Sequence, residues 1–148
     1  MHIQPVQTSA QVDEVRQLFE EYWAAFGFTP CFQNFDAELA GLPGKYAAPD
    51  GRLALAIVDG SAAGCVALRR FDAQRAEAKR LYVRPLFRGL GIGRALMDWI
   101  IAEARAAGYS EIVGDTLPVM QTALEMYDRM GFERSQDASG AIYLRLPL

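Results

Sequence analysis

The chain has 148 residues, of which 51% are hydrophobic and 22% charged, and its net charge is −3 at pH 7. This size and balance are typical of one globular domain with a hydrophobic core, so we predict a single domain over residues 1–148. The acidic net charge argues against a broad nucleic-acid-binding surface, and no apolar run approaches the roughly 20 residues that a membrane span needs.

The number of cysteines and histidines and the composition of the N-terminal segment restrict the class of protein further. Two cysteines, Cys31 and Cys65, are too few for a disulfide framework, and with His2 as the one histidine we expect no metal site. The segment MHIQPVQTSAQ lacks the basic and then apolar regions of a signal peptide. We therefore expect a cytoplasmic protein.

The first half of the chain predicts a strand, a helix, a loop-rich segment and a hairpin. Residues 2–6 form the strand, and Thr8 and Gln11 have the spacing of a helix capping box. The apolar face of the helix that follows is Val12, Val15, Leu18, Phe19, Tyr22 and Phe26. Residues 27–51 carry prolines and glycines between scattered aromatics, which predicts loop with one short helix at 35–41. The turn signal Asp59-Gly60 then predicts a hairpin between strands at 52–58 and 62–69.

The second half predicts alternating strands and helices. A strand covers residues 76–83, and a helix over 91–108 has the apolar face Ile92, Ala95, Leu96, Trp99, Ile100 and Ala104. A strand at 111–116 precedes a helix that Pro118 can start and Gly131 ends. The last two strands are expected at residues 132–135 and 141–146. This order predicts an α+β domain with a mixed sheet and helices on both faces.

The third strand of this series changes its alternation. Ala76 and Ala78 are apolar at even positions, whereas Leu81 and Val83 are apolar at odd ones. Because a strand changes faces only through an extra residue, this pattern predicts a β-bulge near residues 79–80. Bulges are common beside active sites, where they turn backbone groups out of the ladder. The alternative is that the alanines tolerate either face and carry no signal.

The stretch VRPLFRGLGIGRALMDWI, residues 83–100, joins this strand to the next helix with three glycines and three arginines. A strand, a glycine turn and a helix together present backbone N–H groups that no helical carbonyl accepts, and such groups bind anions. The dinucleotide pattern G-x-G-x-x-G fails in both registers, and the Lys-Ser or Lys-Thr of nucleoside-triphosphate loops does not occur. The pattern present is R-x-x-G-x-G, at residues 88–93. The alternative is a glycine turn that enters a packed helix and holds no ligand.

The stretch KRLYVRPLFRGLGIGRALMDWI resembles the acyl-coenzyme A binding motif of the GCN5-related N-acetyltransferases, the GNAT family. The later stretch ALEMYDRMGF resembles the tyrosine helix of the family, followed by Gly-Phe. The order of predicted elements is similar to the family fold over almost the whole chain, which implies a mostly antiparallel sheet of six to seven strands. The resemblance also implies an acyltransferase that takes its acetyl group from acetyl-CoA.

The resemblance assigns the pyrophosphate of coenzyme A to the glycine turn. The backbone amides of residues 89–94 would bind it, and the guanidinium groups of Arg88 and Arg94 would add charge. The backbone of residues 81–83 would pair with the pantetheine arm as an added strand pairs with a sheet edge. Many relatives have an asparagine against this arm, but this chain has DTLPVMQTA, so Thr116 or Gln121 would substitute, or nothing does. The expected cofactor-binding residues are Leu81, Tyr82, Val83, Arg88, Gly89, Leu90, Gly91, Ile92, Gly93, Arg94, Thr116 and Gln121.

Two side chains are the candidates for catalysis. Tyr127 matches the tyrosine acid of the family, which protonates the leaving sulfur, and the alternative is a core tyrosine. Glu77, the carboxylate in the strand beside the expected bulge, is the candidate base, and the alternative is an exposed glutamate paired with Arg75 or Lys79. A backbone N–H near residues 80–81 would stabilise the oxyanion.

These motifs do not specify the acceptor. In relatives the loop-rich segment covers the acceptor side, where Phe28, Phe32, Phe35 and Tyr46 would line the site or else pin the segment to the sheet. We expect a small-molecule primary amine or an amino acid that attacks the acetyl group directly in a ternary complex, with no nucleic-acid or membrane partner and with a homodimer allowed. The alternatives are a non-catalytic acyl-coenzyme A sensor or partner module, and a nucleotide-binding protein that uses the same anion site.

Overall fold

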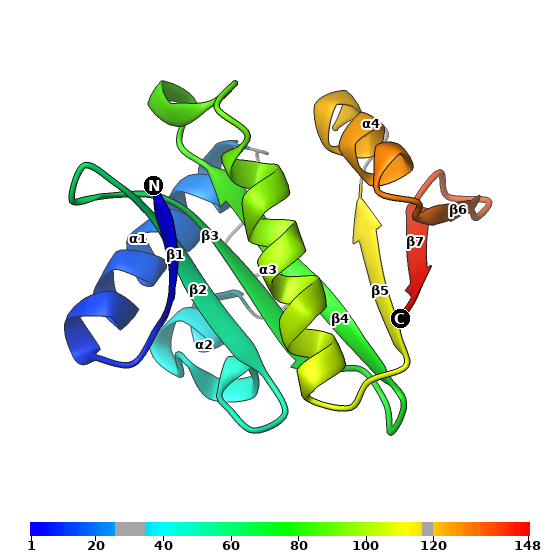
Figure 1. The fold of residues 1–148 in the computed structure, drawn as a ribbon, viewed down its shortest axis with the longest axis horizontal. Helices are drawn as coiled ribbons and strands as arrows, with labels where there is room; N and C mark the ends of the chain where they lie inside the picture. Colours follow the sequence, from blue (N-terminus) through cyan, green and yellow to red (C-terminus); the bar gives the residue numbers. More distant parts are fainter. Residues whose placement is uncertain (26–34, 117–119) are drawn as a thin grey trace.

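The computed structural model describes residues 1–25, 35–116 and 120–148, and these form a seven-stranded sheet in the order β1-β2-β3-β4-β5-β7-β6 (Figure 1). Neighbouring strands are antiparallel except β4 and β5, which are parallel. The strands are β1 (His2–Pro5), β2 (Arg52–Val58), β3 (Ser61–Arg70), β4 (Arg75–Val83), β5 (Glu111–Thr116), β6 (Glu133–Gln136) and β7 (Ile142–Pro147). The expectation of a mostly antiparallel sheet of six to seven strands is confirmed.

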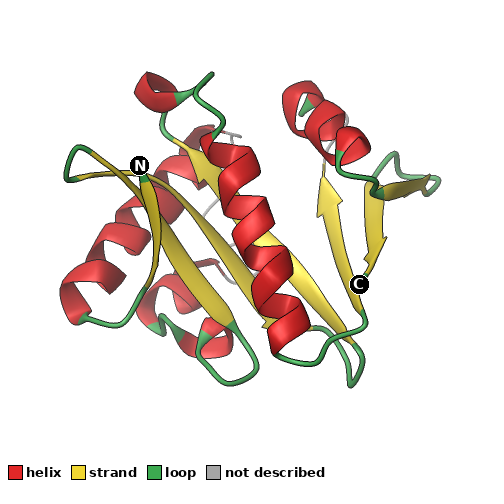
Figure 2. Cartoon of the chain, in the orientation of Figure 1, coloured by secondary structure: helices red, strands yellow, loops and turns green. Residues whose placement is uncertain are grey.

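Helices cover both faces of this sheet (Figure 2). α1 (Ser9–Ala25) and α2 (Phe35–Ala40) pack on one face, and α3 (Ile92–Ala106) packs on the other. α4 (Gln121–Arg129) packs on the same side as α3, where Leu124 joins the core that α3 covers. Two short 3-10 helices, η2 (Gly44–Tyr46) and η3 (Pro85–Phe87), lie before β2 and before α3. The α+β class with helices on both faces is therefore confirmed.

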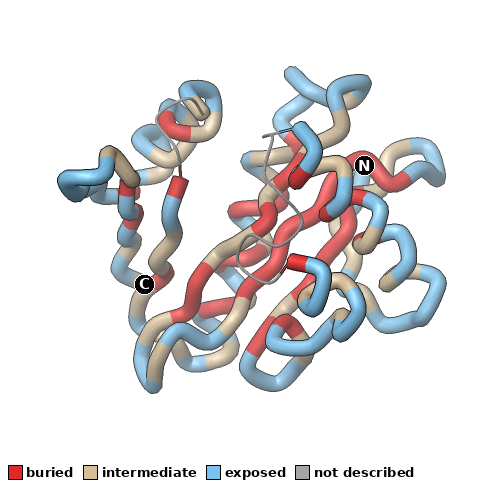
Figure 3. Tube along the Cα trace, turned by 180° about the vertical axis from the view of Figure 1, so that it is seen from behind, coloured by how far each residue is buried: buried red, intermediate tan, exposed pale blue. Residues whose placement is uncertain are grey.

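The alternation of side chains along the central strands divides the core into two layers. On β2, Leu53 and Leu55 pack beneath α1, whereas Ala54 and Ala56 pack beneath α3. Figure 3 shows buried backbone running along the central strands, with exposed residues gathered in the turns and at the outer surface of the helices. The small alanine side chains on one face let the bulkier residues of α3 fill that layer: Ile92, Leu96, Met97, Ile100, Ile101 and Ala104.

The start of α1 follows the capping-box prediction. The backbone N–H of Gln11 donates to Thr8 Oγ1 at 3.2 Å, and the N–H of Thr8 donates to Gln11 Oε1 at 2.9 Å. The buried face of α1 differs from the expected one because it includes Trp23, which lies one helical turn after Phe19, while Val12 is only half-buried. Phe26, also expected there, lies outside the described residues.

The last two strands agree with the sequence within one residue. The short final strands begin at Glu133 and Ile142, each one residue later than expected. Pro118, the expected start of the last helix, lies outside the described residues, and α4 begins at Gln121. Among the helices of the described ranges, none combines the length and apolarity that crossing a membrane requires.

Candidate active site

The parallel strands β4 and β5 separate after three residue pairs. They pair at Arg75 with Glu111, at Ala76 with Ile112 and at Glu77 with Val113, and no further pairs join them. Beyond this point lies a cleft of about 700 Å³, closed on its other sides by the turn before α3 and by α4. The described residues that were expected to bind the cofactor and that line it are Leu81, Tyr82, Val83, Arg88, Gly89, Gly91, Ile92, Gly93, Arg94, Thr116 and Gln121.

β4 carries the bulge that its change of alternation predicted. In the ladder with β3, Cys65 pairs with Tyr82 and Ala67 pairs with Lys79, so residues 80–81 together face Val66 alone. The side chains on both sides of the bulge pack into the layer beneath α3, namely Ala76, Ala78, Leu81 and Val83. The prediction of a bulge near residues 79–80 is therefore confirmed, and the bulge lies at the wall of the cleft.

The bulge residue Arg80 has a left-handed backbone and a buried side chain. Its φ is +60°, a conformation that costs free energy for any residue with a Cβ. The guanidinium of Arg80 donates two hydrogen bonds to Glu38 of α2, each 3.0 Å long, and lies 5.0 Å from the centre of the Trp23 ring. A bidentate ion pair and an aromatic wall therefore hold Arg80 in place.

The turn before α3 has the geometry of an anion site. Gly89 and Gly91 have φ values of +81° and +79°, in the region that favours glycine, and no other atom lies within 4 Å of the position a Cβ would take. Gly91 is the N-cap of α3 and no side chain caps the helix, so the N–H groups of its first turn have no side-chain partner. The helix dipole adds partial positive charge at the same place.

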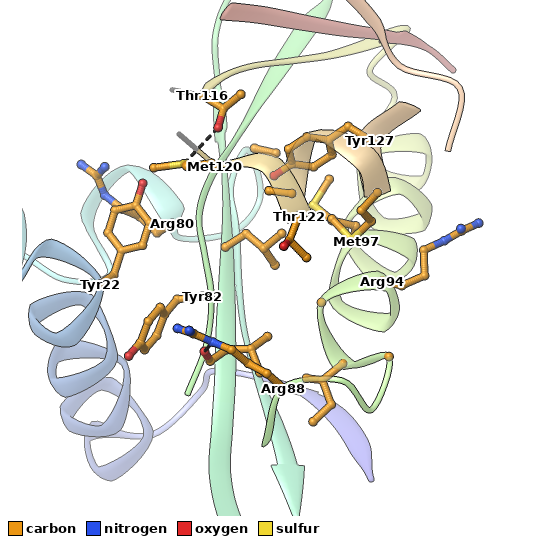
Figure 4. A pocket seen from close by; sticks show the side chains of 18 of the residues that line it. Tyr22, Arg80, Tyr82, Arg88, Arg94, Met97, Thr116, Met120, Thr122 and Tyr127 are labelled. Carbon is orange, nitrogen blue, oxygen red and sulfur yellow. Dashed lines mark hydrogen bonds between the residues drawn. The ribbon is translucent and has the colours of Figure 1, made fainter. Parts of the chain in front are cut away.

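The arginines near this turn have different partners. Arg88 is exposed, and its Nε donates to the carbonyl of Val83 at 2.9 Å, which places its guanidinium beside the cleft. Arg94 pairs with Asp98 one turn along α3 at 3.2 Å, and in Figure 4 its side chain points away from the other labelled side chains. Arg84 binds Glu21 of α1 at 2.8 Å. Arg88 is therefore the better placed of the two arginines expected to contact a phosphate.

Tyr127 reaches the cleft from α4. Its ring packs against Phe132 with 5.3 Å between ring centres, and its phenol oxygen points into the cleft (Figure 4). Burial raises the pKa of the Tyr127 phenol, and the charges of Tyr22 and Asp115 raise it further. The phenol therefore keeps its proton at neutral pH and can donate it.

Glu77 lies outside this group. It lines a second hollow, of about 470 Å³, and the cleft residues of the described chain do not include it. Its carboxylate pairs with Arg69 of β3 at 2.5 Å, so Arg75 and Lys79, the partners expected if Glu77 were structural, are not its partners. Any proton transfer to Glu77 from the cleft would need bridging water.

The other residues expected at the site lie in three places: at the cleft wall, at the surface and in the core. The hydroxyl group of Thr116 donates a hydrogen bond to Met120 Sδ at 3.0 Å. Leu90 is 65% exposed and does not line the cleft. Phe35 and Tyr46 do not line the cleft. Phe35 stacks on Trp23 with 4.0 Å between ring centres, and both residues are at most 4% exposed. They pin their segment to the sheet, which was the alternative interpretation.

Known proteins are similar to this chain in sequence and in fold. The family model described as the acetyltransferase (GNAT) family matches residues 12–132. The chain belongs to the GNAT acetyltransferase family. An uncharacterized N-acetyltransferase of Schizosaccharomyces pombe is 37% identical over 153 residues, which cover 99% of this chain and 94% of that relative. The IAA acetyltransferase of Azospirillum brasilense is 36% identical over 122 residues, covering 81% of this chain and 77% of the relative.

A solved structure supports the same fold for this GNAT protein. A Salmonella typhimurium protein, solved with its cofactor acetyl-CoA, superposes with a TM-score of 0.81 over 100% of this chain and 94% of that one, at 17% identity. At this identity the likeness shows a shared fold.

The cleft of this GNAT protein also has residues that the sequence interpretation did not assign. Tyr22, Lys79 and Asp115 all line it. The sequence predicts Tyr22 on the buried face of α1, whereas it is half-buried at the cleft. Asp115 lies near the carboxyl end of β5, a strand that enters the site, and this position is the sequence signal that points to it. Two sequence-predicted acceptor residues, Phe28 and Phe32, lie outside the described residues. Within the described ranges no three His, Cys, Asp or Glu side chains are grouped as a metal site.

Proposed function

We propose that this protein is an N-acetyltransferase that moves the acetyl group of acetyl-CoA to a primary amine by direct attack in a ternary complex. The observation that carries the proposal is one continuous cleft with the glycine turn at one end and the Tyr127 phenol inside it. Membership of the GNAT family and the Salmonella typhimurium structure with acetyl-CoA support the choice of cofactor. Bound acetyl-CoA supplies the acetyl group as a thioester.

The residues of the cleft fit this cofactor. The N–H groups at the start of α3, with Gly89 and Gly91 leaving open space around them, bind a pyrophosphate, and Arg88 adds a positive charge. The edge of β4 beyond Glu77 has no strand partner on the β5 side, so its backbone groups bind the pantetheine arm in the manner of an added strand. A cleft of about 700 Å³ lies within the usual range for a small-molecule site.

The bulge and Tyr127 perform two parts of the reaction. A backbone N–H of residues 80–81, released from the ladder by the bulge, stabilises the oxyanion that forms on the acetyl oxygen. The Tyr127 phenol protonates the thiolate that leaves, and its raised pKa keeps that proton available. A thiol has a pKa near 8.5, so the thiolate leaves without much help, and Tyr127 increases the rate without being indispensable.

The acceptor amine must lose a proton, because a free alkyl amine has a pKa near 10.4. We retain Glu77 as the base and infer that it takes this proton through water, since it lies in the hollow next to the cleft.

Thiol release from acetyl-CoA, measured with a pool of primary amines and amino acids, tests the proposed function. We expect release that depends on the acceptor, with acetylated product detected by mass spectrometry. Tyr127→Phe should lower kcat roughly 10- to 100-fold and leave the KM for acetyl-CoA within about twofold. Tyr109→Phe is the matched control, because its hydroxyl donates to the carbonyl of Asp50 at 2.8 Å and does not line the cleft.

Two results would contradict this proposal. Tight binding of acetyl-CoA with no thiol release for any acceptor would show a sensor rather than an enzyme. Equal kcat values for the wild type and Tyr127→Phe would remove Tyr127 from the reaction while leaving acetyl transfer intact.

A further inference from the structure

Two charged side chains in the cleft have no part in the reaction described so far. Lys79 of β4 and Asp115 of β5 both line it. Lys79 precedes Val83 by four residues, which corresponds to roughly 13 Å of strand, so it lies far from the phosphate-binding turn. Asp115 lines both the cleft and the second hollow, which places its carboxylate where the two spaces meet. Both charges therefore lie at the end of the cleft where the acetyl group would react.

The other charges around this point are already neutralised. Arg69 pairs with Glu77 at 2.5 Å, and Arg80 pairs with Glu38 at 3.0 Å. Across the second hollow, Arg145 binds two carboxylates, those of Glu111 and Glu133, at 2.8 Å each. In the described ranges, the side chains of Lys79 and Asp115 make no ion pair and no hydrogen bond, with each other or with any other group. Both side chains are therefore available to a ligand in the cleft, which the guanidinium of Arg129 on α4 also lines.

Lys79 and Asp115 interact electrostatically with each other, and Asp115 also interacts with Tyr127. Burial lowers the pKa of the Lys79 ammonium, and the nearby Arg80 lowers it further, while Glu77 and Asp115 oppose this effect. Asp115 is also among the charges that raise the pKa of the Tyr127 phenol, after burial and Tyr22. Lys79 is partly buried whereas Asp115 is exposed, so a ligand that supplies a partner for the Lys79 charge relieves the cost of burying it.

We propose that the acetyl acceptor is an amino acid, whose ammonium group binds the carboxylate of Asp115 and whose carboxylate binds the ammonium group of Lys79. This inference rests on the proposed function and names its substrate class. A zwitterion satisfies both charges at once and adds no net charge to the cleft. A diamine or a polyamine would bring a second positive charge toward Lys79, and an amine without a carboxylate would leave Lys79 without a partner.

Matched acceptors test this proposal in the wild-type enzyme. Leucine, leucinamide and 3-methylbutylamine form one series, and phenylalanine, phenylalaninamide and phenethylamine form another. In each series we expect kcat/KM for the amino acid to exceed that for the amide and the amine by roughly 10- to 100-fold, because only the amino acid carries the carboxylate. An enzyme that acetylates the amide or the amine as well as the amino acid overturns the proposal and leaves the proposed function standing.

Substitutions of Lys79 and Asp115 test which end of the acceptor each of these side chains binds. Lys79→Met should lower kcat/KM for the amino acid to about the level of its amide and leave the amide unchanged, and Lys79→Arg should keep part of the preference. Asp115→Asn should lower kcat/KM about tenfold or more for all three acceptors, since all three carry the ammonium group. The controls are Lys45→Met and Asp59→Asn, exposed residues outside the cleft.

The affinity for acetyl-CoA separates this proposal from the proposed function. It should stay within about twofold in every variant, because neither charge lies at the phosphate-binding turn. A preference for the amino acid that persists in Lys79→Met, with acetyl-CoA affinity intact, overturns the role of Lys79 in binding the carboxylate. If acetyl-CoA does not bind or no acceptor of either series is acetylated, the proposed function fails and this inference fails with it.

Discussion

At the residue scale, Arg80 fixes the part of β4 on which the proposed reaction depends. Its φ of +60° is unfavourable for an arginine, and the cost is offset by the pair of hydrogen bonds to Glu38 and by the ring of Trp23. Both charged side chains are largely removed from water, being 5% and 20% exposed for Arg80 and Glu38. Loss of one partner would leave the other charge poorly solvated and free the bulge to relax.

Glu38→Gln tests this anchoring. We expect the free energy of unfolding to fall by about 2–3 kcal/mol, somewhat less than for complete loss of a buried partner because glutamine still accepts a hydrogen bond. Asp98→Asn, which neutralises the exposed pair with Arg94, should cost under about 1 kcal/mol in the same denaturation experiment. If the bulge N–H stabilises the oxyanion, Glu38→Gln should also lower kcat, by about tenfold, more than it changes the KM for acetyl-CoA. Equal stability losses in the two variants would contradict the anchoring.

At the element scale, the turn before α3 and the first turn of that helix have separate requirements for glycine. Gly91, with φ of +79°, needs the conformation that other residues avoid, although space for a side chain exists. Gly93 lies inside the helix, and a Cβ there would contact Met126 Sδ and Val83 Cγ2 at 3.8 Å, on the wall of the cleft. The first glycine shapes the turn, and the second keeps the cleft open.

The pair Gly91→Ala and Gly93→Ala therefore distinguishes folding from binding. Gly91→Ala should lower the free energy of unfolding by about 1–2 kcal/mol through backbone strain. Gly93→Ala should leave it unchanged or raise it by up to about 1 kcal/mol, because alanine favours the helix, while weakening acetyl-CoA binding. Chemical denaturation and calorimetric titration of both variants measure the two effects. Unchanged acetyl-CoA affinity in Gly93→Ala would show that the cofactor does not pass this side of α3.

Local sequence patterns predict the helices, the strands and the glycine turn before α3. They do not predict contacts between residues that lie far apart in the sequence. The change of alternation between Ala78 and Leu81 predicted the bulge, since side chains on both sides of it face the same core layer. The partner of Arg80 is 42 residues away in the sequence, at Glu38, and no periodicity reports such a contact. For the same reason Phe35 was taken as a possible acceptor residue, although its stacking on Trp23 places it in the core.

At the scale of the whole molecule, the cleft separates two parts of the sheet. β1–β4 with α1, α2 and α3 form the larger part, and β5–β7 with α4 form the smaller one (Figure 1). β4 and β5 are paired at three positions only, so the splayed ends depend on core packing and on whatever fills the cleft. A ligand that contacts α3, β4 and α4 together should therefore stabilise the fold as a whole.

Thermal unfolding with acetyl-CoA, coenzyme A, ATP and NADH in parallel tests the central claim that this cleft is a coenzyme A site. At 100 times its dissociation constant a ligand adds about 2.7 kcal/mol, which raises the Tm of a domain of this size by roughly 5–10 °C. We predict such a shift with acetyl-CoA and coenzyme A and not with ATP or NADH. The absence of a shift with the two coenzyme A species, or an equal shift with ATP, would contradict the assignment of the glycine turn.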